Sequence, residues 1–239
     1  MNQNIKTQAF KQGIYEISST QKETLGCLRV MADGRKFRYA KATAVALIPG
    51  VCLQCAAPTA NHINRSAVVT AIGSQQVTFT VGATEVTADM YKDGYLQVNA
   101  GTAGTLGRQY RIKSHTTVTS AGGSITVQLD EPLGVALIAT TDKLSLIPNP
   151  FNGVSEGAVQ KPCAGIAPVP VTASYYFWAQ TGGVAAALLD NATAVGSNLI
   201  PAASGGVKLF VVDYLQPVIG YALGVGVTNE YKPMFLTID

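Results

Sequence analysis

Residues Leu25–Ala42 read LGCLRVMADGRKFRYAKA and predict a β-hairpin. Asp33-Gly34 is a strong hairpin-turn signal, and it separates two strand-like runs, Leu25–Met31 and Lys36–Ala40. Because side chains alternate between the two faces of a strand, the second run places aromatic residues on one face and cationic residues on the other.

Further strand signals follow from the middle of the chain to its end. They are rich in Val, Ile, Thr and Tyr and are separated by Gly, Asn and Pro, a pattern typical of an all-β sandwich or barrel. Thr181-Gly182-Gly183 predicts a turn between two of them. The predicted strands are Val68–Ile72, Gln76–Val81, Tyr95–Val98, Gln109–Thr119, Ser124–Leu129, Lys143–Ile147, Ser174–Gln180, Val184–Leu189, Val207–Val212, Pro217–Val227 and Met234–Ile238.

The composition along the chain suggests two β subdomains. Residues 1–24 are polar with few apolar anchors and predict a flexible N-terminal arm. A first β domain is expected over 25–147 and a second β block over 171–239. Residues 148–170 are rich in proline and predict an extended connector. The alternative is one continuous fold in which this connector crosses a surface.

Charge and hydropathy exclude several classes of protein. Hydrophobic residues make up 47% and charged residues 13% of the 239 residues, which argues against intrinsic disorder. The formal net charge of +3 is too small to indicate a nucleic-acid binder. No apolar run is long enough for a membrane-spanning helix, and the first residues lack the apolar core of a secretory signal. We therefore expect a protein made in the cytoplasm, with no nucleic-acid or membrane partner.

The cysteines and histidines of the sequence give little support for a metal site or a redox site. Cys52 and Cys55 form a CxxC pair with His62 seven residues later, but a closed zinc site needs four ligands and no second pair is present. Cys27 and Cys163 are isolated, and four cysteines in a chain of this length do not make a disulfide scaffold. We expect no metal and no cofactor.

Catalytic motifs are absent as well. There is no GxSxG nucleophile motif and no phosphate-binding loop ending in GK[ST]. His115 lies in a strand-like run, where a structural role is expected. The carboxylates have no spacing that can be related to a glycosidase pair without knowing the strand register. We predict no catalytic residues and a protein that is not an enzyme.

A cationic cluster in the predicted hairpin has three interpretations. Basic residues between aromatic ones can bind single-stranded nucleic acid. The aromatic face can instead pack inward while the cationic face meets water, or the cluster can dock on an acidic protein surface. The cationic residues are Arg29, Arg35, Lys36, Arg38 and Lys41, and the aromatic ones are Phe37 and Tyr39.

Two stretches resemble structural proteins of tailed bacteriophages. LGCLRVMADGRKFRYAKA is similar to their N-terminal DGR-x-F-R-Y-A signature. SYYFWAQTGGVAAAL, together with the closing EYKPMFLTID, resembles the aromatic strand and C-terminus of the same group. The matched positions are Gly26, Asp33, Gly34, Arg35, Phe37, Arg38, Tyr39, Ala40, Tyr176, Trp178, Gln180, Thr181 and Gly183.

The resemblance implies a capsid decoration, or cement, protein of the virion. Such a protein binds the major capsid protein on the outside of the phage head after synthesis in the cytoplasm of the host bacterium. Three-fold positions of the head favour a homotrimer. The residues expected to bind the capsid are Arg35, Lys36, Phe37, Arg38 and Tyr39. The residues expected in a core strand or a strand at the oligomer axis are Tyr176, Trp178 and Gln180.

Two other functions compete with capsid binding. The first is a head-fibre or tail-fibre module that grips host glycans, in which Tyr91 and Tyr95 would stack on sugars. The second is a polysaccharide depolymerase, which would need paired carboxylates in a groove. The chain shows none of the fixed-period repeats of a β-helix that such enzymes usually carry.

Overall fold

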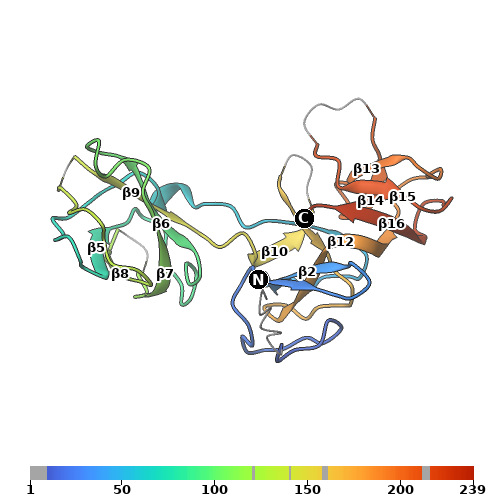
Figure 1. The fold of residues 1–239 in the computed structure, drawn as a ribbon, viewed down its shortest axis with the longest axis horizontal. Helices are drawn as coiled ribbons and strands as arrows, with labels where there is room; N and C mark the ends of the chain where they lie inside the picture. The colour runs from blue at the N-terminus through green and yellow to red at the C-terminus, as the bar shows by residue number, and fades with distance from the viewer. Residues whose placement is uncertain (1–9, 120–121, 140, 158–160, 212–215) are drawn as a thin grey trace, which may run out of the picture. The chain divides into compact units, whose positions relative to one another are not determined.

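The computed structural model of the chain describes residues 10–119, 122–139, 141–157, 161–211 and 216–239. The chain forms two compact units (Figure 1). Unit 1 combines Met1–Cys55 with Phe151–Asp239, and unit 2 is the intervening Ala56–Pro150. Within the described residues, the regular elements are β-strands and one short 3-10 helix, η1 (Ala60–His62), so the predicted all-β class is confirmed. No helix in this part of the chain has the length and apolar character needed to span a bilayer.

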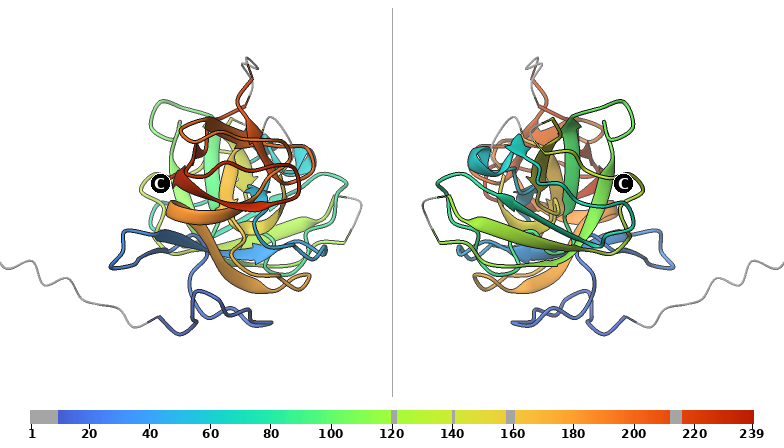
Figure 2. Two further views of the ribbon diagram at one scale, coloured as in Figure 1. Left: turned by 90° about the vertical axis from the view of Figure 1, so that its right-hand side faces the viewer. Right: turned by 90° about the vertical axis from the view of Figure 1, so that its left-hand side faces the viewer.

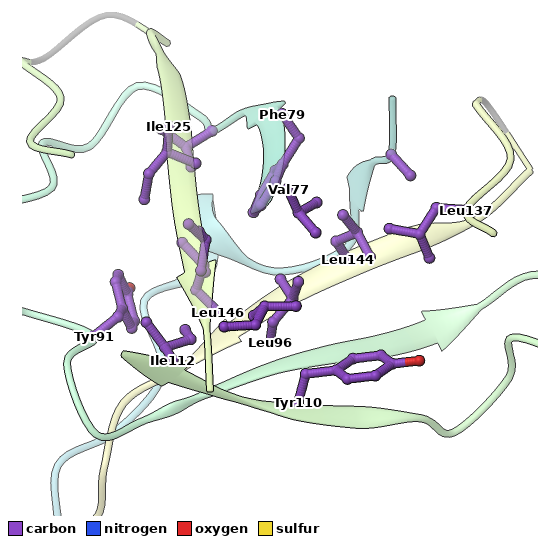
Figure 3. Close-up of a cluster of buried hydrophobic side chains, with 14 of the residues drawn as sticks. Val77, Phe79, Tyr91, Leu96, Tyr110, Ile112, Ile125, Leu137, Leu144 and Leu146 are labelled. Atoms are coloured by element: carbon purple, nitrogen blue, oxygen red, sulfur yellow. The ribbon is translucent and has the colours of Figure 1, made fainter. Parts of the chain in front are cut away.

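Unit 2 is a barrel-like antiparallel sheet around one apolar core. Its strands are β4 (Arg65–Ser66), β5 (Gln76–Thr80), β6 (Tyr95–Ala100), β7 (Gln109–His115), β8 (Ser124–Leu129) and β9 (Lys143–Ile147). They follow the order β4-β9-β6-β7-β8-β5. Buried and exposed side chains alternate along β5, so that Val77 and Phe79 point into the core with Leu96 and Leu144 (Figure 3).

Unit 1 contains two rings of strands that share one long strand. The first ring, lobe A, consists of β2 (Lys36–Ala42), β3 (Cys52–Gln54), β10 (Asn152–Glu156), β11 (Cys163–Ile166) and the first half of β12 (Tyr176–Leu188). The order is β2-β10-β3-β11-β12, and β12 pairs back with β2, which closes the ring. Leu53, Val154 and Phe177 pack inside it. β1 (Leu28–Val30) adds one antiparallel strand beside β2, as the Asp33-Gly34 turn predicts.

The second ring, lobe B, continues from the second half of β12. Its other strands are β13 (Asn198–Pro201), β14 (Val207–Leu209), β15 (Gly220–Ala222) and β16 (Tyr231–Thr237). They follow the order β12-β16-β15-β13-β14, and a bridge from Leu189, just after β12, to Val207 completes the ring. β16, in red, pairs with β12, in orange, as the left view of Figure 2 shows. Lobe B has its own core, which includes Leu199 and Met234.

The same kind of short segment precedes two strands in each lobe. The segment starts with a residue that forms an isolated β-bridge. The residue three positions later has a positive φ, and a strand begins five positions after the bridge residue. The bridge pairs are Leu47 with Val171 in lobe A and Thr193 with Gly226 in lobe B. The positive-φ residues are Gly50, Ser174, Gly196 and Asn229. Each of these four residues donates its backbone N–H to a backbone carbonyl. In lobe A, Gly50 donates to Ala167 at 2.8 Å and Ser174 donates to Thr43 at 2.7 Å. In lobe B, Gly196 donates to Ala222 and Asn229 donates to Leu189, both at 2.8 Å.

These contacts show that lobe A and lobe B repeat one plan. The strands of the two lobes correspond in chain order. Lobe A contributes β2, β3, β10, β11 and the first half of β12. Their counterparts in lobe B are the second half of β12, then β13, β14, β15 and β16. In lobe B the connection from β13 to β14 is short and spans 202–206. In lobe A the corresponding connection, from β3 to β10, carries unit 2. Unit 2 is therefore an insertion into a loop of lobe A.

Equivalent glycines of the two lobes give a matched test of this plan. Both Gly50 and Gly196 have positive φ, but a Cβ at Gly50 would lie 2.6 Å from Cε1 of Tyr231, whereas a Cβ at Gly196 meets nothing within 4 Å. We expect Gly196→Ala to lower the free energy of unfolding by about 1 kcal/mol through backbone strain alone. Gly50→Ala adds the clash and is expected to cost about 2–4 kcal/mol in urea unfolding. Equal losses would contradict the described packing at Gly50.

The expected division into 25–147, a connector over 148–170, and 171–239 is wrong. The described part of 148–170 contains β10 and β11, and both pair with β3. Its prolines lie outside these two strands, so they interrupt no ladder bond. The boundary was misplaced because lobe A is assembled from strands on either side of unit 2, and no local pattern reports such distant pairing.

The predicted turn at Thr181-Gly182-Gly183 is wrong as well, because β12 runs through it. The pairing of β12 with β2 shifts register between Gln180 and Gly182, and Gly183 has a φ of +78°. Such a bulge bends a strand without ending it, and glycine supplies the required backbone conformation. β12 can therefore leave lobe A and continue into lobe B. The predicted strand Val68–Ile72 is also absent from the described structure, where only Thr70 forms an isolated bridge.

Candidate interaction surface

The two stretches that carry the family resemblance are neighbouring strands. β2 and the first half of β12 form an antiparallel ladder in which Tyr39 lies opposite Trp178 and Phe37 lies opposite Gln180. Their side chains alternate between two cores. Phe177 points into lobe A, while Tyr39 and Trp178 belong to a separate cluster on the other face. The resemblance therefore falls on one continuous structural element.

Trp178 occupies the centre of this aromatic cluster. Its side chain is fully buried. The rings of Phe10 and Tyr39 both meet the indole edge-on, each with a centroid separation of 5.1 Å. Tyr39 also stacks on Tyr176 at 6.0 Å. These aromatic contacts stabilise beyond the burial of area alone, so the cluster fixes β2, β12 and the N-terminal segment together.

Gln12 holds the N-terminal segment against the ladder. Its carbonyl accepts a hydrogen bond from Nε1 of Trp178 at 3.0 Å, and its Oε1 accepts one from the Tyr39 hydroxyl at 2.6 Å. Its Nε2 donates to the carbonyl of Tyr176 at 3.1 Å. Burial of the Tyr39 phenol raises its pKa to about 12, so it stays a neutral donor at ordinary pH.

The expected flexible arm over 1–24 is therefore wrong for its described part. Gln12 is only 3% exposed, and Ile14 lies in the same buried cluster. The sequence suggested an arm because apolar anchors are sparse there, but a buried glutamine with satisfied hydrogen bonds can anchor a segment equally well. Residues 1–9 lie outside the described residues.

Two of the cationic side chains cover the aromatic cluster. The guanidinium of Arg29 lies 4.9 Å from the ring centroid of Phe10 and 5.5 Å from that of Trp178. The Lys41 ammonium lies 5.3 Å from the centroid of Tyr176. Cation–π contacts of this kind contribute roughly 0.5–1 kcal/mol at exposed sites. Arg29 and Lys41 thus contribute to the stability of the fold.

Two further cations form ion pairs at the surface. Arg35 donates to Asp33 at 2.7 Å and to the Tyr15 hydroxyl at 3.0 Å. Arg38 makes two bonds to Asp239, at 2.8 and 3.1 Å. The hydrogen bonds from Arg38 lower the pKa of the Asp239 carboxyl. Exposed pairs like these add little stability, but they fix where the charges stand.

The expectation that Phe37 and Tyr39 contact a capsid is wrong in this fold. Both side chains are 0% exposed, as the inward-facing interpretation of the hairpin predicts. Lys36 and Arg38 alternate with them along β2, and Arg35 directly precedes the strand. All three are partly exposed, so they remain candidates for partner contact. Tyr176, Trp178 and Gln180 are buried within unit 1 itself.

A groove in unit 1 lies beside two of the predicted site residues. It has a volume of about 410 Å³, and its lining includes Arg35 and Gln180. Tyr15 and Tyr231 also line it, with 60% and 50% of their surfaces exposed, as does Val184 at 51%. The remaining lining is mainly proline, alanine and other apolar residues, with Lys232 as a second cation. An apolar groove with exposed tyrosines is suited to an extended peptide or a flat ring.

The CxxC pair and His62 belong to different units, with Cys52 and Cys55 in unit 1. His62 lies in unit 2, where it is buried and its ring nitrogens contact the Tyr91 hydroxyl and the Thr84 carbonyl. His115 accepts a hydrogen bond from the Tyr91 N–H at 3.0 Å. Over the described ranges, no three His, Cys, Asp or Glu residues are grouped so as to hold a metal.

No family model, curated protein or solved structure matches the chain.

Sequence reasoning missed Gln12, Tyr15 and Tyr231. Gln12 and Tyr15 were assigned to an arm, and nothing in a polar segment marks one glutamine as buried. Tyr231 belongs to the closing EYKPMFLTID stretch, and its alternation with the buried Met234 and Leu236 gave a weak signal that it faces outward. The groove itself had no signal, because it depends on how β12 and β16 pair.

Proposed function

We propose that the chain is a non-enzymatic structural protein of a phage virion, a decoration protein that binds the outside of the head shell. The observation that carries the proposal is the apolar groove with its exposed tyrosines, next to the ladder that bears the family resemblance. Interface cores are enriched in tyrosine and arginine, and Tyr15, Tyr231 and Arg35 all line this groove. The proposed partner is the major capsid protein.

The outer edge of β1 offers a second contact element. Among the described strands, β1 pairs only with β2, so its other edge carries no ladder partner there. Leu28 and Val30 are 42% and 57% exposed on this strand. An exposed apolar edge can accept a strand from another chain through main-chain hydrogen bonds. In a homotrimer at a three-fold position, this edge would join neighbouring copies or reach the shell.

The proposed mechanism is avidity. Each contact is modest, since the groove and one sheet edge are small interfaces, but several contacts act together on one particle. A lattice of bound copies makes dissociation, or bursting of the shell, require the simultaneous loss of many contacts. The stiff β body of unit 1 transmits load between these contacts without a reactive centre.

A charge placed in the groove tests this proposal. Val184 is exposed, so Val184→Asp is expected to leave unit 1 folded while burying an unpaired carboxylate in the complex. We expect at least a tenfold loss of affinity, about 1.4 kcal/mol, for purified heads that lack the protein, measured by co-sedimentation.

Val69→Asp is the matched control, because Val69 is an exposed valine in unit 2 and lies outside the groove. It is expected to bind like the unmodified chain. Equal binding of all three proteins to heads would refute a role for the groove, and no binding by any of them would refute capsid decoration.

Glycan binding is the second candidate function, and the same groove favours it. Tyr15 and Tyr231 present exposed aromatic rings that can stack on sugars. Tyr91, expected to stack on sugars, is buried in the core of unit 2 and cannot do so. A glycan array distinguishes the two functions. A decoration protein should give no specific signal on the array. A glycan-binding module should give a specific signal, and Tyr231→Ala should abolish that signal.

A further inference from the structure

Two cysteines from strands on either side of unit 2 meet in lobe A. Cys52 lies on β3 and Cys163 lies on β11, and the two strands are antiparallel neighbours. The Sγ atoms are 2.7 Å apart, although 111 positions separate the residues in the sequence. A disulfide bond has an S–S length of about 2.05 Å, so the thiols need to approach by less than about 1 Å to be bridged.

The surroundings give the two thiols different roles. Cys52 is 1% exposed, whereas Cys163 is only partly buried. The hydrogen-bonded contact between the two sulfurs lowers the pKa of the Cys163 thiol and raises that of the Cys52 thiol. Cys163 is thus the more accessible and the more nucleophilic sulfur, and Cys52 is placed to react second.

Cys55 is the cysteine that could compete with Cys52 for a disulfide bond to Cys163. It lies one residue beyond β3, and its N–H donates to the carbonyl of Pro162 at 2.9 Å. Burial raises the pKa of the Cys55 thiol to about 11, which keeps it protonated and unreactive. No contact between the Cys55 and Cys163 sulfurs matches the 2.7 Å approach of Cys52.

We propose that Cys52 and Cys163 are a redox-sensitive pair that forms a disulfide when the protein meets an oxidising environment. Because unit 2 lies between these two residues, the bond would tie together the two chain segments that lead into and out of the insertion. The pair would be reduced during synthesis in a reducing cytoplasm and would lock lobe A afterwards. This inference does not depend on capsid binding.

The reaction with a small disulfide such as oxidised glutathione is balanced as follows. The Cys163 thiolate attacks one glutathione sulfur, which forms a mixed disulfide and releases one glutathione thiolate. Cys52 then loses its proton to solvent and attacks Sγ of Cys163, which releases the second glutathione thiolate. Two protein thiols are oxidised, and one glutathione disulfide is reduced to two thiols.

Thiol counting on the full chain tests the proposal. The reduced protein has four cysteines, so treatment with oxidised glutathione should leave two alkylatable thiols, at Cys27 and Cys55. Peptide mapping by mass spectrometry should find the Cys52–Cys163 link. The mid-point of thermal unfolding of unit 1 should rise by about 5–15 °C, as expected for closing a long loop.

Matched variants separate the pair from its neighbours. Cys163→Ser should retain all its remaining thiols after oxidation, while Cys55→Ser and Cys27→Ser should each still lose two. A protease cut within unit 2 of the oxidised chain should leave two fragments that separate only under reducing conditions, which reports the bond even if a variant folds poorly. Four free thiols after oxidation, or a Cys55–Cys163 link, would overturn the proposal.

Discussion

Replacement of Trp178 by alanine is expected to lower the free energy of unfolding of unit 1 by about 3–5 kcal/mol. The indole is fully buried between the rings of Phe10 and Tyr39, and its N–H donates to the carbonyl of Gln12. Truncation removes these contacts and leaves a cavity between β2, β12 and the N-terminal segment. The loss should be measured by urea unfolding followed by circular dichroism, because Trp178 is the only tryptophan of the chain.

Two further variants serve as controls for the loss of stability in Trp178→Ala. Trp178→Phe keeps an aromatic ring but removes the hydrogen bond to Gln12, so a smaller loss of about 1–2 kcal/mol is expected. Tyr231→Ala removes a half-exposed aromatic side chain of the same unit and should cost under about 1 kcal/mol. A loss below about 1 kcal/mol for Trp178→Ala would show that this cluster is not packed as described.

Local patterns in the sequence predicted much of unit 2 and the first hairpin correctly. Asp33-Gly34 specified a turn, and the alternation of Phe37 and Tyr39 with Lys36 and Arg38 placed the aromatic and cationic residues on opposite faces, because both signals act within a few residues. Turn residues separate the strand-like runs of unit 2, so the approximate limits of β5 to β9 could be read in order. In the same unit, the predicted strand Val68–Ile72 was wrong and β4 was missed.

The features that the sequence did not predict are those that depend on distant pairing. Lobe A joins β3 to β10 and β11 across the whole of unit 2, and no residue near Pro148 marks that pairing. β12 looked like two strands because Gly182 and Gly183 resemble a turn, whereas they form a bulge. The repeat of lobe A in lobe B was invisible because the positive-φ position is filled by Gly, Ser, Gly and Asn in turn.

The sequence did not predict the groove. Arg35 was expected at a capsid contact and Gln180 in a core strand or a strand at the oligomer axis. Both line the groove, and their roles in binding stay predictions. The sequence could not place Tyr231 beside them, since that contact arises from the pairing of β12 with β16. Nor could spacing bring Cys52 and Cys163 together, because their contact depends on the register of β3 and β11.

Removal of residues 1–20 is expected to destabilise unit 1 rather than to leave a folded body without its arm. The truncation eliminates the edge-on contact of the Phe10 ring with Trp178 and leaves the Tyr39 hydroxyl without its acceptor on Gln12. Exposure of this apolar surface and loss of the buried hydrogen bonds should together cost at least about 3 kcal/mol. The emission of Trp178 should shift to the red and become accessible to a soluble quencher.

Removal of residues 1–9 is the matched control, because it eliminates none of the described contacts of Trp178 and Gln12. Its emission and unfolding curve should match those of the full chain. Gln12→Ala removes only the side-chain hydrogen bonds of Gln12. Its free energy of unfolding should lie between those of the two truncations, about 1–3 kcal/mol below that of the full chain. If the 1–20 truncation keeps the emission and stability of the full chain, the N-terminal segment does not cover Trp178. Head binding by the 1–9 truncation then tests the arm separately from the fold.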